Sequence, residues 1–171
     1  QFEVMEKTLR IILKKDPNDV NSLNALGYSL ADRNIKLPEA YDLILKAHKL
    51  SPNDAFILDS LGWVNFRLGN TTLALTQLQD ALRMKPEADI AAHLGEVLWV
   101  FNRPAEAESA WRQGELIDAN NPTLKETLKR LKPDWILSVD KLANQWDGRF
   151  AVKMNDRPAN NTQGGSGSFT L

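Results

Sequence analysis

The sequence of 171 residues contains no cysteine, which excludes disulfide bonds, thiolate chemistry and cysteine-based zinc sites. It also lacks an excess of either charge, because 21 basic residues face 22 acidic ones for a formal net charge of −1. Proteins that bind nucleic acid through phosphate contacts usually carry a basic face, so this balance argues against that class. No apolar run approaches the roughly 20 residues of a membrane-spanning helix. With 43% apolar residues, the chain is long enough for one domain with its own core, or one domain and a fragment of another.

Residue patterns that carry catalytic or metal chemistry are also scarce. The two histidines, His48 and His93, lie in no metal-binding motif. His93 and Glu96 share a helical face, but two ligands do not make a metal site, so we interpret His93 as a surface histidine beside a solvated carboxylate. The glycine-rich run at 164–167 lacks the GK[ST] ending of a phosphate loop. We therefore predict no enzymatic activity, no cofactor and no metal site in these residues.

What the chain does contain is a period of about 34 residues. Leucine–glycine pairs recur at 26–27, 61–62 and 94–95, and prolines recur at 17, 52 and 86. An alanine lies between these marks in each unit, at Ala40, Ala74 and Ala107. Three signals that share one period predict a repeat architecture.

The middle unit, residues 55–87, shows what one repeat consists of. Leu58, Leu61 and Gly62 lie on one helical stripe, and a second apolar stripe begins at Ala74. The pair Gly69–Asn70 between them favours the left-handed backbone of a turn. Each unit is therefore predicted to be a helix–turn–helix in which small residues let two antiparallel helices approach closely.

This pattern resembles the tetratricopeptide repeat, whose signature is W-x2-L-G-x2-Y, then A-x3-F, then P. The second unit reads Leu58-x2-Leu61-Gly62, then Ala74-x3-Leu78, then a proline. The first and third units match with small departures, such as Ala119 in the third unit's proline slot. The resemblance implies a mainly α fold, a right-handed α-solenoid of antiparallel helix pairs.

The repeat marks also predict the organisation of the chain. We expect a solenoid over 1–132: a half repeat at 1–19, repeats at about 20–53, 54–87 and 88–121, and a capping helix at 122–132. The half repeat corresponds to the second half of a unit, so we expect its first half, and further repeats, to precede Gln1. A closing helix would cover the last apolar surface of the stack.

The composition changes after Pro133. Residues 134–146 have helical spacing, and alternation in 149–154 and 168–171 predicts two strands around a polar, glycine-rich loop. For 133–171 we predict a short helix and an incomplete β-hairpin, the start of a truncated β domain or a hairpin that pairs with another molecule. This tail resembles the opening of the bacterial outer-membrane lipoprotein receptor LolB, although the lipidated cysteine of that family is absent. A generic β-hairpin is the alternative.

The resemblance to tetratricopeptide repeats also implies where a partner would bind, because the first helix of each unit lines the concave side of the solenoid. Counting from the leucine–glycine pairs, the predicted binding groove contains Asn24, Tyr28, Asp59, Trp63, Phe66, Arg67, Glu96 and Trp99. Aromatic anchors in a polar surround are typical of protein-binding hot spots. We interpret Trp63 and Trp99 as groove residues, Trp111 as a packing residue, and leave both readings open for Phe66.

Together these features predict a non-enzymatic scaffold that holds a protein or peptide in the concave groove. Because carboxylates outnumber basic residues there, a neutral or mildly basic apolar segment fits better than an acidic tail. The alternative is the adaptor part of a LolB-like lipoprotein receptor, with an acyl-chain ligand if more strands follow. Self-association through the open hairpin edge is a third possibility. The LolB resemblance implies a periplasmic location and a role in outer-membrane biogenesis, whereas the repeats alone suit the cytoplasm equally well.

Overall fold

The structure is a computed structural model and describes residues 1–135. All the regular structure in these residues is helical. The helices are α1 (Phe2–Lys15), α2 (Val20–Asp32), α3 (Leu37–Leu50), α4 (Ala55–Arg67), α5 (Thr71–Met84), α6 (Ala88–Val100), α7 (Pro104–Asp118) and α8 (Pro122–Leu131). The predicted mainly α fold is confirmed for this part of the chain. The predicted β-hairpin lies outside the described residues.

The helix ends follow from side chains that the sequence places just before them. The Asp19 carboxylate accepts a hydrogen bond from the backbone N–H of Ser22 at 2.8 Å, and caps α2. Asp54 caps α4 in the same way, and Asn121 caps α8. These caps satisfy N–H groups that have no partner within the helix. At the turn between α4 and α5, Gly69 has φ +89°, a backbone conformation that glycine adopts without steric cost.

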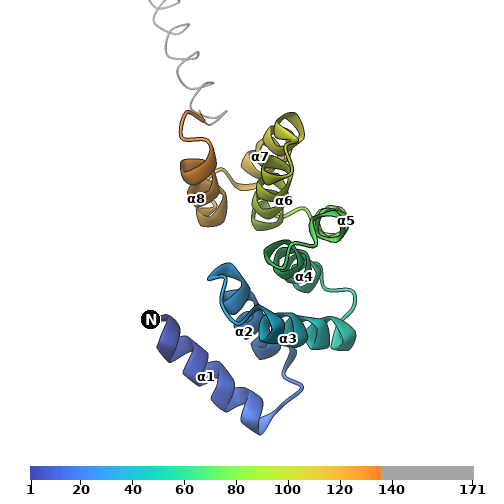
Figure 1. The fold of residues 1–171 in the computed structure, drawn as a ribbon, viewed down its shortest axis with the longest axis vertical. Helices are drawn as coiled ribbons and strands as arrows, with labels where there is room; N and C mark the ends of the chain where they lie inside the picture. The colour runs from blue at the N-terminus through green and yellow to red at the C-terminus, as the bar shows by residue number, and fades with distance from the viewer. Residues whose placement is uncertain (136–171) are drawn as a thin grey trace, which may run out of the picture. The chain divides into compact units, whose positions relative to one another are not determined.

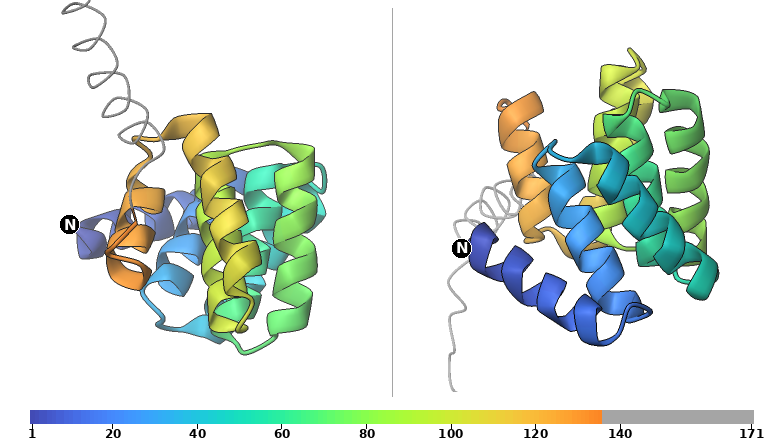
Figure 2. Two further views of the ribbon diagram at one scale, coloured as in Figure 1. Left: turned by 90° about the horizontal axis from the view of Figure 1, so that it is seen from above. Right: turned by 60° about the horizontal axis from the view of Figure 1, so that its bottom comes forward.

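The helices form antiparallel pairs that stack in chain order (Figure 1). The pairs are α2 with α3, α4 with α5, and α6 with α7, and two further views show each pair side by side (Figure 2). Helices α2, α4 and α6 also contact one another in sequence, and α8 packs against α6. These four helices share one side of the stack, which becomes the site described below.

The core lies where paired helices cross at a glycine. A β-carbon on Gly27 would come within 2.5 Å of the Ile44 side chain, and one on Gly95 would overlap the indole of Trp111. Such close approach requires a residue without a side chain. Trp111 is fully buried, as its interpretation as a packing residue requires. The leucines of the repeat signature are expected in the core, and Leu26, Leu61, Leu78 and Leu94 are buried there, whereas Leu58 is only partly buried.

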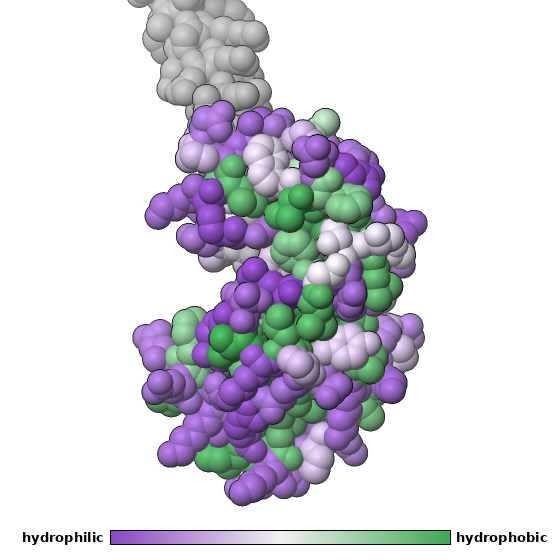
Figure 3. Space-filling view, in the orientation of Figure 1, coloured by the Kyte–Doolittle hydropathy of each residue, from purple (hydrophilic) through white to green (hydrophobic). Residues whose placement is uncertain are grey.

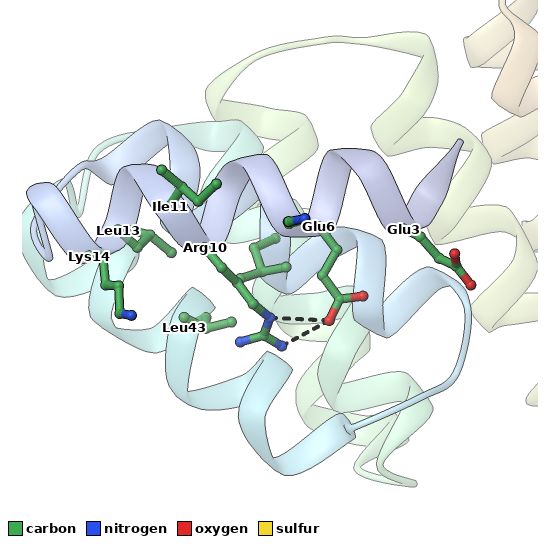
Figure 4. Close-up of a pocket in the computed structure, with 9 residues that line it drawn as sticks. Glu3, Glu6, Arg10, Ile11, Leu13, Lys14 and Leu43 are labelled. Atoms are coloured by element: carbon green, nitrogen blue, oxygen red, sulfur yellow. Dashed lines mark hydrogen bonds and ion pairs between the residues drawn. The ribbon is translucent and has the colours of Figure 1, made fainter.

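Helix α1 differs from the second helices of the complete pairs. Met5 and Ile12 occupy the positions that Ala40 and Ala47 occupy in α3, counted from the proline that follows each helix. Both alanines are fully buried against α2, whereas Met5 and Ile12 are 37% and 38% exposed. The side of α1 that faces α2 and α3 borders a pocket of about 680 Å³, crossed by an ion pair between Glu6 and Arg10 (Figure 4). In the described residues, α1 is thus an amphipathic helix packed on one side only.

Candidate binding groove

The side of the stack shared by α2, α4, α6 and α8 contains two adjoining pockets. They measure about 240 and 270 Å³ and share the wall residues Tyr28, His93 and Thr123. We call their combined lining the inner groove. Its wall comes from Asn24, Ala25, Tyr28, Asp32, Phe56, Asp59, Ser60, Trp63, Asp89, His93, Glu96, Pro122, Thr123, Glu126, Thr127 and Arg130. In the space-filling view the surface is hollowed between the region of α2 and that of α8 (Figure 3).

His93 lies at the centre of the inner groove. Its Nδ1 is 2.8 Å from one Asp59 carboxylate oxygen and its Nε2 is 3.1 Å from the Tyr28 hydroxyl. Its ring stacks on the indole of Trp63, with 4.4 Å between the ring centroids. The interpretation of His93 as a surface histidine beside Glu96 was wrong, because the imidazole is only 3% exposed and its carboxylate partner comes from α4.

The carboxylates around this cluster set its electrostatics. Burial lowers the pKa of the His93 imidazole, but the contact with Asp59, with help from Asp32 and Asp89, more than offsets it and raises the pKa above its ordinary value of 6.5. Burial and the same three carboxylates raise the pKa of the Tyr28 phenol. The hydroxyl therefore stays neutral and the imidazole tends toward its charged form.

Trp63 forms the floor of the groove and is not an exposed anchor. The side chain is only 2% exposed, and its indole N–H donates to an Asp32 carboxylate oxygen at 3.3 Å. The Arg67 guanidinium lies over the indole, 4.8 Å from the ring centroid, and Phe66 packs against the same indole. Among the tyrosine, phenylalanine and tryptophan rings of the described residues, Tyr28 is the one that borders both pockets, and it is half-buried.

Helix α8 supplies the wall opposite α2. Arg130 donates to both carboxylate oxygens of Glu96 at 2.9 and 2.8 Å, a bidentate ion pair to a carboxylate that is almost fully buried. The Asn121 amide donates to Asp89 at 3.1 Å. Because these bonds join α6 to α8, the far wall of the groove is held in place before any partner arrives.

The structure brings together five of the eight predicted groove residues. Asn24, Tyr28, Asp59, Trp63 and Glu96 line the inner groove. Phe66 and Arg67 pack against Trp63 as described above. Trp99 packs against Trp111, with 5.5 Å between ring centroids, and lies under the Lys132 ammonium. Its surroundings are those of a packing residue.

Sequence reasoning missed the partners of His93 and Glu96, although the repeat period contains a signal for both. Asp59 precedes His93 by 34 residues, and Glu96 precedes Arg130 by 34 residues. These separations match the repeat period to within one residue, since the glycines of the second and third units are 33 residues apart. Residues about one period apart lie at the same or a neighbouring register on adjacent helices, so oppositely charged pairs at that separation can meet. A search for such pairs would have identified both contacts.

No group of three or more histidine, aspartate or glutamate side chains in residues 1–135 is arranged to hold a metal ion. None of the helices in this part of the chain is both long and apolar enough to cross a membrane.

Comparisons with known proteins bear on the repeats. The sequence model of the Tetratricopeptide repeat family matches residues 60–122. The TPR repeat-containing protein PA4667 of Pseudomonas aeruginosa is 47% identical over 127 residues, which are 74% of this chain and 22% of that protein. The chain thus spans about a fifth of the length of this curated relative.

Solved structures match the fold at lower identity. TTC0263, a thermophilic TPR protein of Thermus thermophilus, has a TM-score of 0.62 at 18% identity, over 74% of this chain and 70% of that one. The first TPR domain of human RPAP3 has a TM-score of 0.57 at 16% identity, over 82% and 99% of the two chains. MamA has a TM-score of 0.55 at 23% identity, over 72% and 75%. These likenesses show a shared arrangement of helix pairs.

Proposed function

Because the chain is a tetratricopeptide repeat protein, we propose that it is a non-enzymatic scaffold that holds a segment of a partner protein in the inner groove. Repeats of this family are protein-interaction modules in general. The finer assignment to the inner groove is supported by one observation above all. Residues from four helices line it, and hydrogen bonds and ion pairs already fix its polar side chains.

The fixed geometry matters for the energetics of binding. Ordering a rotamer-rich side chain at an interface costs about 0.5–1.5 kcal/mol. The side chains of Asp59, His93 and Glu96 are already ordered in the folded chain, since each is almost fully buried and bonded to a neighbour. Binding therefore does not have to order them. A partner segment would therefore meet a preorganised wall in which Tyr28 supplies an accessible aromatic surface.

The proposal can be tested even while the partner is unidentified. A random peptide library displayed on phage is selected on the immobilised chain, and the enriched peptides are tested on two variants. Ala25→Tyr places a ring in the inner groove from an exposed position on α2, and Ala105→Tyr places the same ring at an exposed position on α7. We expect Ala25→Tyr to weaken binding at least about tenfold, or about 1.4 kcal/mol, and Ala105→Tyr to leave it unchanged.

Exposed substitutions of this kind change stability by about 0.5 kcal/mol or less, so thermal melts should match for the two variants. Enriched peptides that bind the Ala25→Tyr variant as tightly as the unaltered chain would place the binding site elsewhere and refute the proposal. Equal weakening of peptide binding by Ala25→Tyr and Ala105→Tyr would also refute the proposal, because only the first of these residues lines the inner groove.

The lipoprotein-receptor alternative and the periplasmic location rest on the resemblance of residues 134–171. All but the first two of these residues lie outside the described part of the chain, and so does the hairpin edge expected to self-associate. These three points stay predictions, and no contact in the groove depends on them.

A further inference from the structure

We propose that the partner segment is basic, and that one lysine or arginine side chain enters the smaller pocket of the inner groove between Tyr28, Phe56 and Asp89. This inference rests on the proposed function and names the chemistry of the segment that the groove would hold. It follows from the charge, the aromatic rings and one unsatisfied acceptor in the groove wall.

The charge of the wall is strongly one-sided. Five carboxylates line the inner groove, and one guanidinium and one imidazole accompany them. Two of the carboxylates are neutralised locally, Asp59 by His93 and Glu96 by Arg130. The chain as a whole has a formal net charge of only −1, so the acidic excess of the groove is a local feature.

Three carboxylates remain to attract a cation from outside. Asp89 accepts a hydrogen bond from the neutral Asn121 amide, which leaves its charge in place. Asp32 has the Arg67 guanidinium at 3.9 Å, a long separation for an ion pair, and Glu126 is exposed on α8. Narrow, partly desolvated walls of one charge raise the local concentration of oppositely charged groups. The negative potential also acts on the protein's own groups, since it raises the pKa values of both Tyr28 and His93.

Aromatic rings and an acceptor complete the recognition of a cation. Tyr28 and Phe56 line the same pocket as Asp89, and a cation within about 6 Å of an aromatic face is attracted to it. The Phe56 ring already has the Lys85 ammonium 4.7 Å from its centroid, so of these two rings Tyr28 is the one with no lysine or arginine over its face among the contacts in the described residues. The side-chain oxygen of Asn24 is buried in the structure without a hydrogen-bond partner. An ammonium or guanidinium donor would satisfy that oxygen, whereas a carboxylate or an aliphatic group would not.

The test extends the phage selection described above and uses the full chain. Enriched peptides are sequenced, synthesised with a fluorescein label, and measured by fluorescence anisotropy alongside copies in which lysine and arginine are replaced by glutamine. We expect basic residues to be enriched, and the glutamine copies to bind at least about fivefold more weakly, which corresponds to about 1 kcal/mol.

A charge-matched pair of variants locates the contact. Asp89→Asn removes one groove carboxylate, and Asp42→Asn removes one exposed carboxylate from α3 on the outer side of the pair. Asp89→Asn should weaken the basic peptides about fivefold more than it weakens the glutamine copies, and a thermal melt of the variant reports whether the fold is intact. Asp42→Asn should change neither. With the unaltered protein alone, affinity for the basic peptides should fall between about 50 and 200 mM NaCl as charges are screened.

The outcomes separate this inference from the proposed function. Enriched peptides without basic residues that still respond to Ala25→Tyr would overturn the inference and leave the scaffold proposal standing. The inference would also be overturned if basic peptides bound the Asp89→Asn variant as tightly as the unaltered chain. It would be overturned as well if their affinity did not change with NaCl concentration. A selection that enriches nothing counts against both proposals.

Discussion

At the scale of single residues, burial decides what a side chain can do. His93 is surrounded by carboxylates from three helices: Asp32 on α2, Asp59 on α4 and Asp89 on its own helix. In that environment the imidazole is an ion-pair partner and a hydrogen-bond bridge. The local sequence shows only that His93 lies close to Glu96 and does not indicate that the imidazole is buried. The role of His93 depends on contacts with other repeats, which the local sequence does not show.

The raised pKa of His93 predicts a pH-dependent stability. The protonated imidazole stabilises the fold fully below its ordinary pKa of 6.5, and this contribution is lost as pH rises through the raised folded-state pKa. The free energy of unfolding, measured by urea titration at several pH values, should therefore fall as pH increases above about 6.5. His93→Gln should remove this fall.

The second histidine supplies the control, because the chain contains only His48 and His93. His48→Gln should leave the pH dependence as it is in the unaltered chain. If His93→Gln and the unaltered chain lose stability in parallel between about pH 6.5 and 9, the imidazole does not carry the charge that we assign to it.

At the scale of helices, the repeats were predictable and the groove only partly so. Helix pairs depend on local signals, such as the glycine at each crossing and the proline that follows, and these recur visibly in the sequence. The interior of the groove depends on how tightly one repeat curves onto the next. Trp63 is buried because His93 of the following repeat stacks on it, a contact that no signal within one unit encodes.

Helix α8 illustrates how one contact can position a whole element. Its ten residues end in Arg130 and Leu131, and Arg130 joins it to the buried Glu96 of α6. We predict that Arg130→Met leaves Glu96 without its cation and costs about 1–2 kcal/mol, discounted because Arg130 is half exposed. Hydrogen exchange should then accelerate in α8 before it accelerates in α6.

Lys129→Met is the matched control, because Lys129 is the exposed neighbour of Arg130 on the same helix. It removes the same charge and adds the same side chain away from Glu96. Equal exchange rates of α8 in the two variants would mean that the ion pair does not hold the helix on α6.

At the scale of all the described repeats, the hydrogen bond between Tyr28 and His93 links the first complete repeat to the third. In a linear solenoid each repeat contacts its neighbours, and stability is close to a sum of repeat and interface contributions. Here residues 65 positions apart in the chain are bonded across the intervening repeat. This bond should make the three repeats unfold more cooperatively than contacts between neighbours alone would.

Tyr28→Phe tests this coupling, because it keeps the ring and removes the hydroxyl that reaches His93. We expect a loss of about 1 kcal/mol, the usual net value of one hydrogen bond, and we expect it to fall unevenly along the chain. In native-state hydrogen exchange, the amides of α2 and α3 should open at lower free energy than those of α6 and α7, whereas the unaltered chain should open both with similar free energies.

Tyr41→Phe removes the same atom from the only other tyrosine, which lies on α3, and should preserve the common opening. Coupling through the groove requires the two variants to differ in the opening free energies of these helices. If Tyr28→Phe lowers the opening free energy equally in all repeats, the cooperativity comes from the contacts between neighbouring helix pairs.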